Sequence, residues 1–193
     1  LNLITHVVGM ADYILIGDGM VFTFLKAQGR EVGNSLVDPS MLSTAKGIMA
    51  RVRGKSKLIF PTDFVCAESL DKSQQAEIYK VGDIPNHLMG LDIGPETISR
   101  YLVIILKSKT ILWNGPMGVF EVDGFHKGTE KIAKRMADVT VNETLTIIGG
   151  GDLAAAVNKF GLMEKFSHVS TGGGASLELL SGKSLPAIYS LEL

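Results

Sequence analysis

The chain has 193 residues, 46% of them apolar, which is enough for one well-buried core and fits a single domain over residues 1–193. Its 19 basic and 20 acidic residues form no long run of one sign, so charge gives no reason to expect nucleic acid or a membrane surface as a partner. The single cysteine, Cys66, excludes an internal disulfide, and no apolar run approaches the ~20 residues of a membrane span. We therefore expect a soluble, cytoplasmic protein. The chain begins at Leu1 in an apolar segment with no helix cap before it, so we also expect it to be a piece of a longer polypeptide.

Short apolar runs of strand length alternate with longer segments of helical spacing. In chain order we predict a strand over residues 13–16, a helix over 20–26, a helix over 39–53, a strand over 57–60, a helix over 96–107, a strand over 110–113, a helix over 125–136, a strand over 145–148, a helix over 152–160 and a strand over 168–170. Residues 64–67 are interpreted as an extended continuation of the second strand, and 69–86 as a polar surface segment with a short edge strand over 77–81. Strands that alternate with helices indicate an α/β fold, here predicted as a doubly wound, Rossmann-like parallel sheet with helices on both faces.

Three glycine clusters each follow a predicted strand. They are Asn114-Gly115-Pro116, Gly149-Gly150-Gly151-Asp152 and Ser170-Thr171-Gly172-Gly173-Gly174. A strand that ends in glycines and opens a helix leaves backbone N–H groups free at the positive end of the helix dipole, where a phosphate binds well. In a doubly wound sheet the ligand lies beyond the carboxyl ends of the strands, where these clusters and Gly17 fall. The pattern predicts a phosphate-binding α/β domain.

Each cluster also has a plainer interpretation. Residues 149–152 match neither the dinucleotide fingerprint nor a P-loop, and they can form a tight turn in which Asp152 caps the helix. Trp113 can be a packing residue before an ordinary turn. Alternatively, this segment forms a base or ribose slot, in which Phe120 is an apolar wall and Glu121 accepts hydrogen bonds from sugar hydroxyls. Asp152 beside phosphates could also help to hold Mg²⁺.

Several long segments together resemble one family. They are residues 17–26, 89–95, 113–121, 147–152 and 167–180. The chain resembles phosphoglycerate kinase, specifically its C-terminal nucleotide-binding domain, in the family's order and over nearly all of its length. The resemblance implies reversible phosphoryl transfer between 1,3-bisphosphoglycerate and Mg-ADP, which gives 3-phosphoglycerate and Mg-ATP. It also implies a monomer that binds Mg²⁺ with ATP or ADP, while a separate N-terminal domain binds the glycerate phosphates.

The resemblance assigns roles to individual residues. Gly151 and Gly173 would offer N–H groups to the transition state, which suits a reaction that depends on positioning and charge stabilisation. The nucleotide would be bound by a larger set, with the ribose on Glu121 and the metal on Asp152. This set comprises Gly17, Gly19, Gly90, Asn114, Glu121, Gly150, Gly151, Asp152, Leu153 and Gly172.

Two residues depart from the family's pattern. Asp18 replaces the middle of three glycines, so a carboxylate at the adenine edge would narrow the slot or repel the nucleotide. Leu153 stands where the family has Ser or Thr, and the lost hydroxyl contact to phosphate is worth about 1.5 to 3 kcal/mol. The family's substrate domain and phosphate-binding lysine are not among these residues, so we expect nucleotide binding with little or no turnover. The alternative is a nonenzymatic binding or relic domain whose nucleotide site is weakened.

Overall fold

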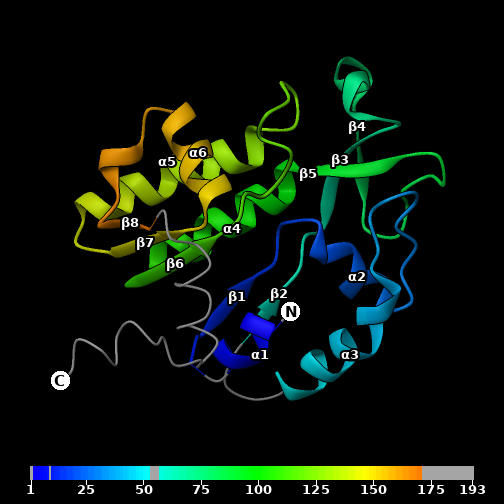
Figure 1. The fold of residues 1–193 in the computed structure, drawn as a ribbon, viewed down its shortest axis with the longest axis horizontal. Coiled ribbons are helices and arrows are strands. Elements are labelled where there is room, and N and C mark those ends of the chain that lie inside the picture. The colour runs from blue at the N-terminus through cyan, green and yellow to red at the C-terminus, as the bar shows by residue number, and fades with distance from the viewer. Residues whose placement is uncertain (1, 9, 53–56, 171–193) are drawn as a thin grey trace.

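The computed structural model describes residues 2–8, 10–52 and 57–170 (Figure 1). The helices are α1 (Asn2–Val7), α2 (Met20–Ala27), α3 (Leu42–Arg51), α4 (Pro95–Lys107), α5 (Lys127–Val141) and α6 (Gly151–Lys159), with short 3₁₀ turns at Pro39–Met41, Leu70–Gln75 and Met163–Lys165. The strands are β1 (Tyr13–Leu15), β2 (Lys57–Ile59), β3 (Asp63–Ala67), β4 (Glu77–Lys80), β5 (Met89–Ile93), β6 (Thr110–Asn114), β7 (Leu145–Gly149) and β8 (His168–Ser170). The helices and strands predicted from the apolar pattern are present. The end of α5 differs most, because this helix continues to Val141.

Within the described residues the strands form three small sheets. β1 pairs with β2 in parallel, β7 pairs in parallel with both β6 and β8, and β3 pairs antiparallel with both β4 and β5. The α/β class is confirmed, but the prediction of one doubly wound parallel sheet is wrong. Asn114 lies beside Gly149, and Gly149 lies beside Ser170, so the carboxyl ends of β6, β7 and β8 meet at one edge.

The antiparallel sheet accounts for the difference. β3 does not continue β2, because Pro61 separates them and has no N–H to donate to a ladder. β5 escaped the sequence analysis because Gly90 and Asp92 are poor strand formers. Cross-strand burial decides the pairing instead, since Phe64 of β3 lies opposite Ile93 of β5 and both are buried.

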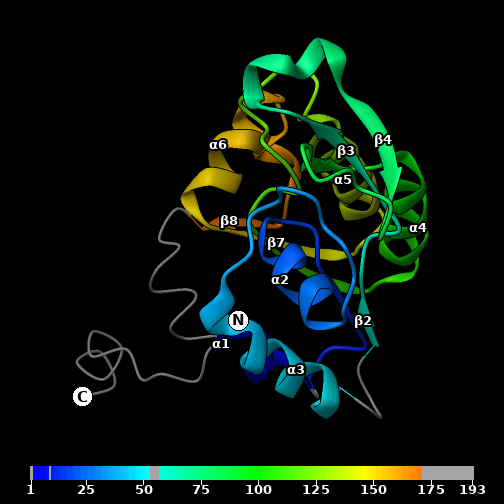
Figure 2. The same cartoon turned by 90° about the vertical axis from the view of Figure 1, so that its right-hand side faces the viewer.

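Helices cover one face of the β6–β7–β8 sheet. Trp113 and Ile148 lie in register on one face and are both buried, and Figures 1 and 2 show α5 and α6 beside this sheet. Leu112 and Leu145 lie on the other face and are 40% and 47% exposed. In the described part of the chain, the helical cover predicted for both faces is therefore not seen on this second face.

Most of the buried apolar side chains of the described residues form one connected core. Tyr101 of α4 is fully buried, and its hydroxyl donates to Ile16 O at 2.6 Å and to Ile59 O at 3.2 Å. These two bonds fix α4 against the carboxyl ends of β1 and β2. Over the described residues, no helix combines the length and the apolar character needed to cross a membrane.

Candidate functional site

The first turn of α6 lies at the carboxyl end of β7 and presents backbone donors for which the described residues show no acceptor. Gly150 has φ +97°, a conformation that favours glycine, and the helix begins at the next residue. No side chain of the described residues caps this helix, and its first backbone bond runs from Ala154 N to Gly150 O at 3.0 Å. The amides of Gly151, Asp152 and Leu153 therefore precede the helical ladder and lie at the positive end of the dipole.

Carboxylates occupy the corresponding place on three other helices. Asp18 Oδ1 accepts the Met20 N–H of α2 at 3.1 Å, Asp63 accepts the Glu96 and Thr97 N–H groups of α4 at 3.0 and 2.8 Å, and Asp92 Oδ2 accepts the Gly128 N–H of α5 at 2.7 Å. Among the described residues, α6 has no such acceptor from outside its own first turn. This helix is thus the one of the four whose N-terminus suits an external anion.

The Asn114 side chain lies at the same edge. A Cβ built on Gly149 would lie 3.3 Å from Asn114 Oδ1, and one on Gly150 would lie 3.4 Å from it. Glycine at these positions leaves the amide room to approach, and Asn114 is exposed. The structure therefore places the Asn114 side chain beside Gly149 and Gly150, directly before the first residue of α6.

Asp18 lies beside the turn that follows Asn114. Its side chain is half-buried, and its Oδ2 is 3.8 Å from the position that a Cβ would take on Gly115. Burial raises the pKa of this carboxyl, while the hydrogen bond from the Met20 N–H lowers it in part. Asp18 thus places a carboxyl group next to the Asn114–Gly115 turn.

An exposed apolar side chain, Leu36, lies at the other end of this region. A Cβ on Gly19 would lie 4.0 Å from Leu36 Cδ2, and the Leu36 side chain is 79% exposed. Gly90 donates its N–H to Ser35 Oγ at 3.0 Å, and a Cβ on Gly90 would collide with the Phe22 ring. The neighbouring residues Ser35 and Leu36 therefore lie beside Gly90 and Gly19, respectively, which the sequence analysis assigned to the nucleotide site. The sequence analysis did not single out Leu36, because its place beside Gly19 depends on the folded chain.

The turn over residues 115–121 is fastened from several sides. Met117 N–H donates to Thr129 Oγ1 at 3.0 Å, Val119 N–H donates to Leu91 O at 3.0 Å, and Lys159 Nζ donates to Phe120 O at 3.0 Å and to Glu121 O at 3.4 Å. Gly17 is buried against the Met117 sulfur, where a Cβ would collide. The Glu121 side chain is exposed at the end of this fixed turn.

Asp92 is a buried carboxyl group that the sequence analysis did not single out. It is 2% exposed and accepts the N–H of Ile93 at 2.8 Å as well as that of Gly128. Burial raises its pKa to about 7, against the lowering effect of these two bonds. A Cβ on either Gly118 or Gly128 would overlap the carboxyl group, so Asp92 joins β5 to the start of α5 and to the 115–121 turn.

The remaining predicted residues differ in placement. The Leu153 side chain is 0% exposed within the core, so only its backbone N–H belongs to the first-turn surface of α6. Asp152 is exposed, and in the described ranges no group of three or more His, Cys, Asp or Glu residues is placed to hold a metal ion. The assignment of Asp152 as a magnesium ligand stays a prediction. Gly172 and Gly173 lie outside the described residues.

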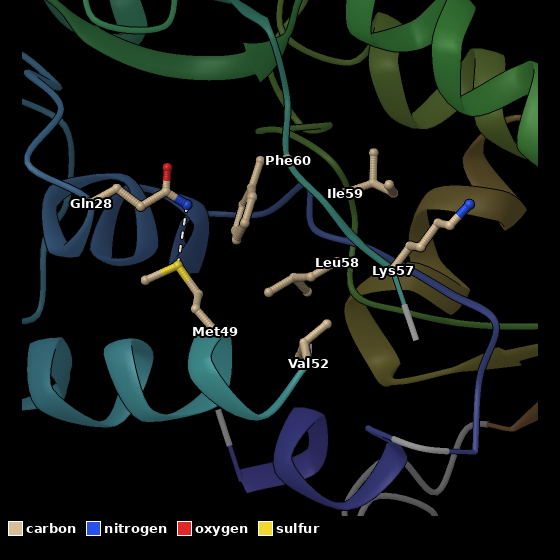
Figure 3. Close-up of a pocket in the computed structure, with 7 residues that line it drawn as sticks. All are labelled: Gln28, Met49, Val52, Lys57, Leu58, Ile59 and Phe60. Carbon is tan, nitrogen blue, oxygen red and sulfur yellow. Dashed lines mark hydrogen bonds between the residues drawn. The ribbon is translucent and has the colours of Figure 1, made fainter. Parts of the chain in front are cut away.

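A pocket of about 460 Å³ lies elsewhere, between α2, α3 and β2 (Figure 3). Its lining residues are Gln28, Met49, Val52, Lys57, Leu58, Ile59 and Phe60. In Figure 3 the Gln28 and Met49 side chains meet across it, with Gln28 Nε2 donating to Met49 Sδ at 3.2 Å. None of its lining residues belongs to the glycine-rich edge, so the two features are separate.

Comparison with known proteins identifies the family. The family model for phosphoglycerate kinase matches residues 1–183. The chain belongs to the phosphoglycerate kinase family. It is 53% identical over 182 residues to the phosphoglycerate kinase of Microcystis aeruginosa, covering 94% of this chain and 45% of that protein. It is 48% identical over 193 residues to the cytosolic phosphoglycerate kinase 3 of Arabidopsis thaliana, covering 100% of this chain and 48% of that protein.

Solved phosphoglycerate kinases share the fold. The structure from Coxiella burnetii has a TM-score of 0.91 at 37% identity and covers 97% of this chain and 48% of that one. The structure from Pyrococcus horikoshii has a TM-score of 0.82 at 27% identity, with 99% and 48% covered. The arrangement of small parallel sheets and one antiparallel sheet therefore matches phosphoglycerate kinases. The chain spans about half the length of the relatives that it matches.

Proposed function

We propose that residues 1–193 form a single domain, the C-terminal nucleotide-binding half of a phosphoglycerate kinase, and that the glycine-rich edge binds Mg-ADP or Mg-ATP. The observation that carries the proposal is the first turn of α6, which has free amides and no capping side chain among the described residues. The exposed Asn114 amide beside it supports the same reading, because amide groups suit phosphate oxygens.

In this proposal the nucleotide lies along the edge of the sheets. The phosphates meet the Gly150, Gly151, Asp152 and Leu153 backbone together with Asn114, the ribose meets Glu121, and the base lies near Gly17, Gly19, Gly90 and Leu36. Asp152 fits a magnesium ion, because it is an exposed carboxylate in the turn that would hold the phosphates. A bound Mg²⁺ would supply positive charge beside the phosphate oxygens.

The proposed reaction transfers a phosphoryl group between 1,3-bisphosphoglycerate and ADP. The Gly151 amide donates to the transferred group, and Gly173, together with Gly172, would serve the same end of the nucleotide. The glycerate phosphates would be bound by the part of the enzyme that this chain does not span. We therefore expect this chain to be a cytoplasmic monomer that binds nucleotide and turns over little by itself, and normal turnover in a coupled assay would contradict that expectation.

Calorimetric titration with Mg-ADP tests the proposal. We expect the wild-type chain to bind in the micromolar to submillimolar range, and Asn114→Ala to bind about tenfold more weakly because one charge-assisted hydrogen bond is lost. Asn142→Ala is the matched control, since Asn142 is also exposed but lies at the end of α5 and donates to Asp138 O at 3.1 Å. Equal losses in both variants would contradict the assigned site.

A nonenzymatic relic domain is the second candidate, and the carboxyl group of Asp18 next to Gly115 is the observation that favours it. In that case the wild-type chain would not bind Mg-ADP, whereas Asp18→Gly would bind it. Binding by the wild-type chain favours the kinase half.

A further inference from the structure

Asp18 stands between the two ends of the proposed nucleotide site. Its Oδ2 lies 3.8 Å from the Cβ position of Gly115, which directly follows the exposed Asn114. On its other side, Gly19 lies next to the exposed Leu36 side chain. In the proposed site, a nucleotide with its base near Leu36 and its phosphates beside Asn114 would run past the Asp18 carboxyl group.

The carboxyl group is only partly satisfied. Oδ1 accepts the Met20 N–H at 3.1 Å, and for Oδ2 the described part of the chain shows neither a hydrogen bond nor an ion pair. The neighbouring elements carry Asp152 on α6 and Glu121 on the turn, which are also acidic. Lys159 of α6 donates to backbone carbonyls of the turn. Burial raises the pKa of Asp18 more than the hydrogen bond from the Met20 N–H lowers it.

We infer that this site binds a nucleotide's phosphates together with one proton, which Asp18 takes from solvent. The inference rests on the nucleotide site proposed above. An ionised carboxylate at this place repels a phosphate, whereas the neutral acid does not, and its O–H can donate to a phosphate oxygen. A glycine, which the family usually has here, carries no group that titrates. The linkage would therefore distinguish this chain from relatives with the usual pattern.

The direction of the pH effect follows from the geometry. Burial already raises the pKa of the Asp18 carboxyl, and a bound anion would raise it further because like charges disfavour ionisation. The liganded chain then holds a proton that the free chain lacks. Affinity for the nucleotide therefore rises as pH falls, by at most about tenfold per pH unit between the two pKa values.

Calorimetric titration with Mg-ADP, at several pH values and in buffers of different ionisation enthalpy, measures the proton uptake directly. We expect the wild-type chain to take up more protons per bound nucleotide than Asp18→Asn does. The difference should approach about one proton per nucleotide. Asparagine keeps an acceptor for the Met20 N–H, so α2 retains its cap. The nucleotide's own phosphate titrates equally in both experiments. Asp18→Gly is a second variant and should behave like Asp18→Asn.

Asp38→Asn is the matched control. Asp38 Oδ1 accepts the Ser40 N–H at 3.0 Å, the same two-residue geometry at the start of a helical turn. This variant should show the proton uptake of the wild-type chain. Equal uptake in wild type and Asp18→Asn, with binding retained, would overturn the inference and leave the nucleotide site standing. Absence of Mg-ADP binding in every folded variant at every pH would overturn the proposed function and the inference with it.

Discussion

Leu153 fills the core beneath the first turn of α6. We expect Leu153→Ser to lower the free energy of unfolding by about 2 to 5 kcal/mol, because it leaves a cavity. Urea denaturation followed by circular dichroism measures this loss. Leu106→Ser makes the same change on α4 at a side chain that is 59% exposed, and should cost about 0.5 kcal/mol. Similar losses in the two variants would contradict the packing described for Leu153.

Asp92 makes the folding stability depend on pH. Burial raises its pKa from 3.8 to about 7 in the folded chain, so between these values the folded chain holds a proton that the unfolded chain releases. Its stabilising contribution is fully present below about pH 4 and is lost as pH rises through about 7, a change on the order of 4 kcal/mol.

Urea unfolding over this pH range checks the effect. The free energy of unfolding of the wild-type chain should fall with rising pH relative to that of Asp92→Asn, while Asp138→Asn, at an exposed position on α5, should follow the wild type. Carbon NMR of the Asp92 carboxyl in the wild-type chain gives the same midpoint without any substitution. A carboxyl that titrates near pH 4 would contradict the prediction.

At the scale of elements, the start of α6 depends on one glycine and tolerates change at the next. Gly150→Ala should lower the free energy of unfolding by about 1 to 3 kcal/mol, because φ +97° is strained for alanine. Gly151→Ala should be neutral or stabilising by up to about 1 kcal/mol, since no described atom lies within 4 Å of its Cβ position and alanine favours the helix. Thermal unfolding of the two variants measures the difference, and a reversed order would rule out this start for α6.

The parallel strands and their helices could be predicted because their apolar periodicity is local. The antiparallel sheet could not, because its pairing depends on contacts between distant segments. β5 contains Gly90 and Asp92, whose intrinsic preferences oppose a strand, yet Phe64 packs against Ile93 across the sheet. The chain changes direction at Pro61, between β2 and β3, and local strand propensity does not predict the new direction of β3.

At the scale of the whole molecule, only part of the candidate site could be predicted from the sequence, as for the fold. Asn114 and Gly149 could be placed together in advance, because parallel strands end at one edge of a sheet. Leu36 and Asp92 could not, since each reaches the site through contacts with segments far away in the chain. The burial of Leu153 could not be predicted from the sequence either, because a residue in the first turn of a helix can face either the ligand or the core.

Through the Lys159 ammonium group, α6 also positions the 115–121 turn. It holds the backbone of Phe120 and Glu121 at the last turn of the helix, while the free amides lie at the first turn. A helix of 9 residues is about 13 Å long and hardly changes length. The rigid helix therefore keeps the Glu121 backbone and the Gly151 amide at a fixed separation. A small anion such as inorganic phosphate, if bound at the first turn of α6, is too short to reach Glu121 at the other end of the helix as well.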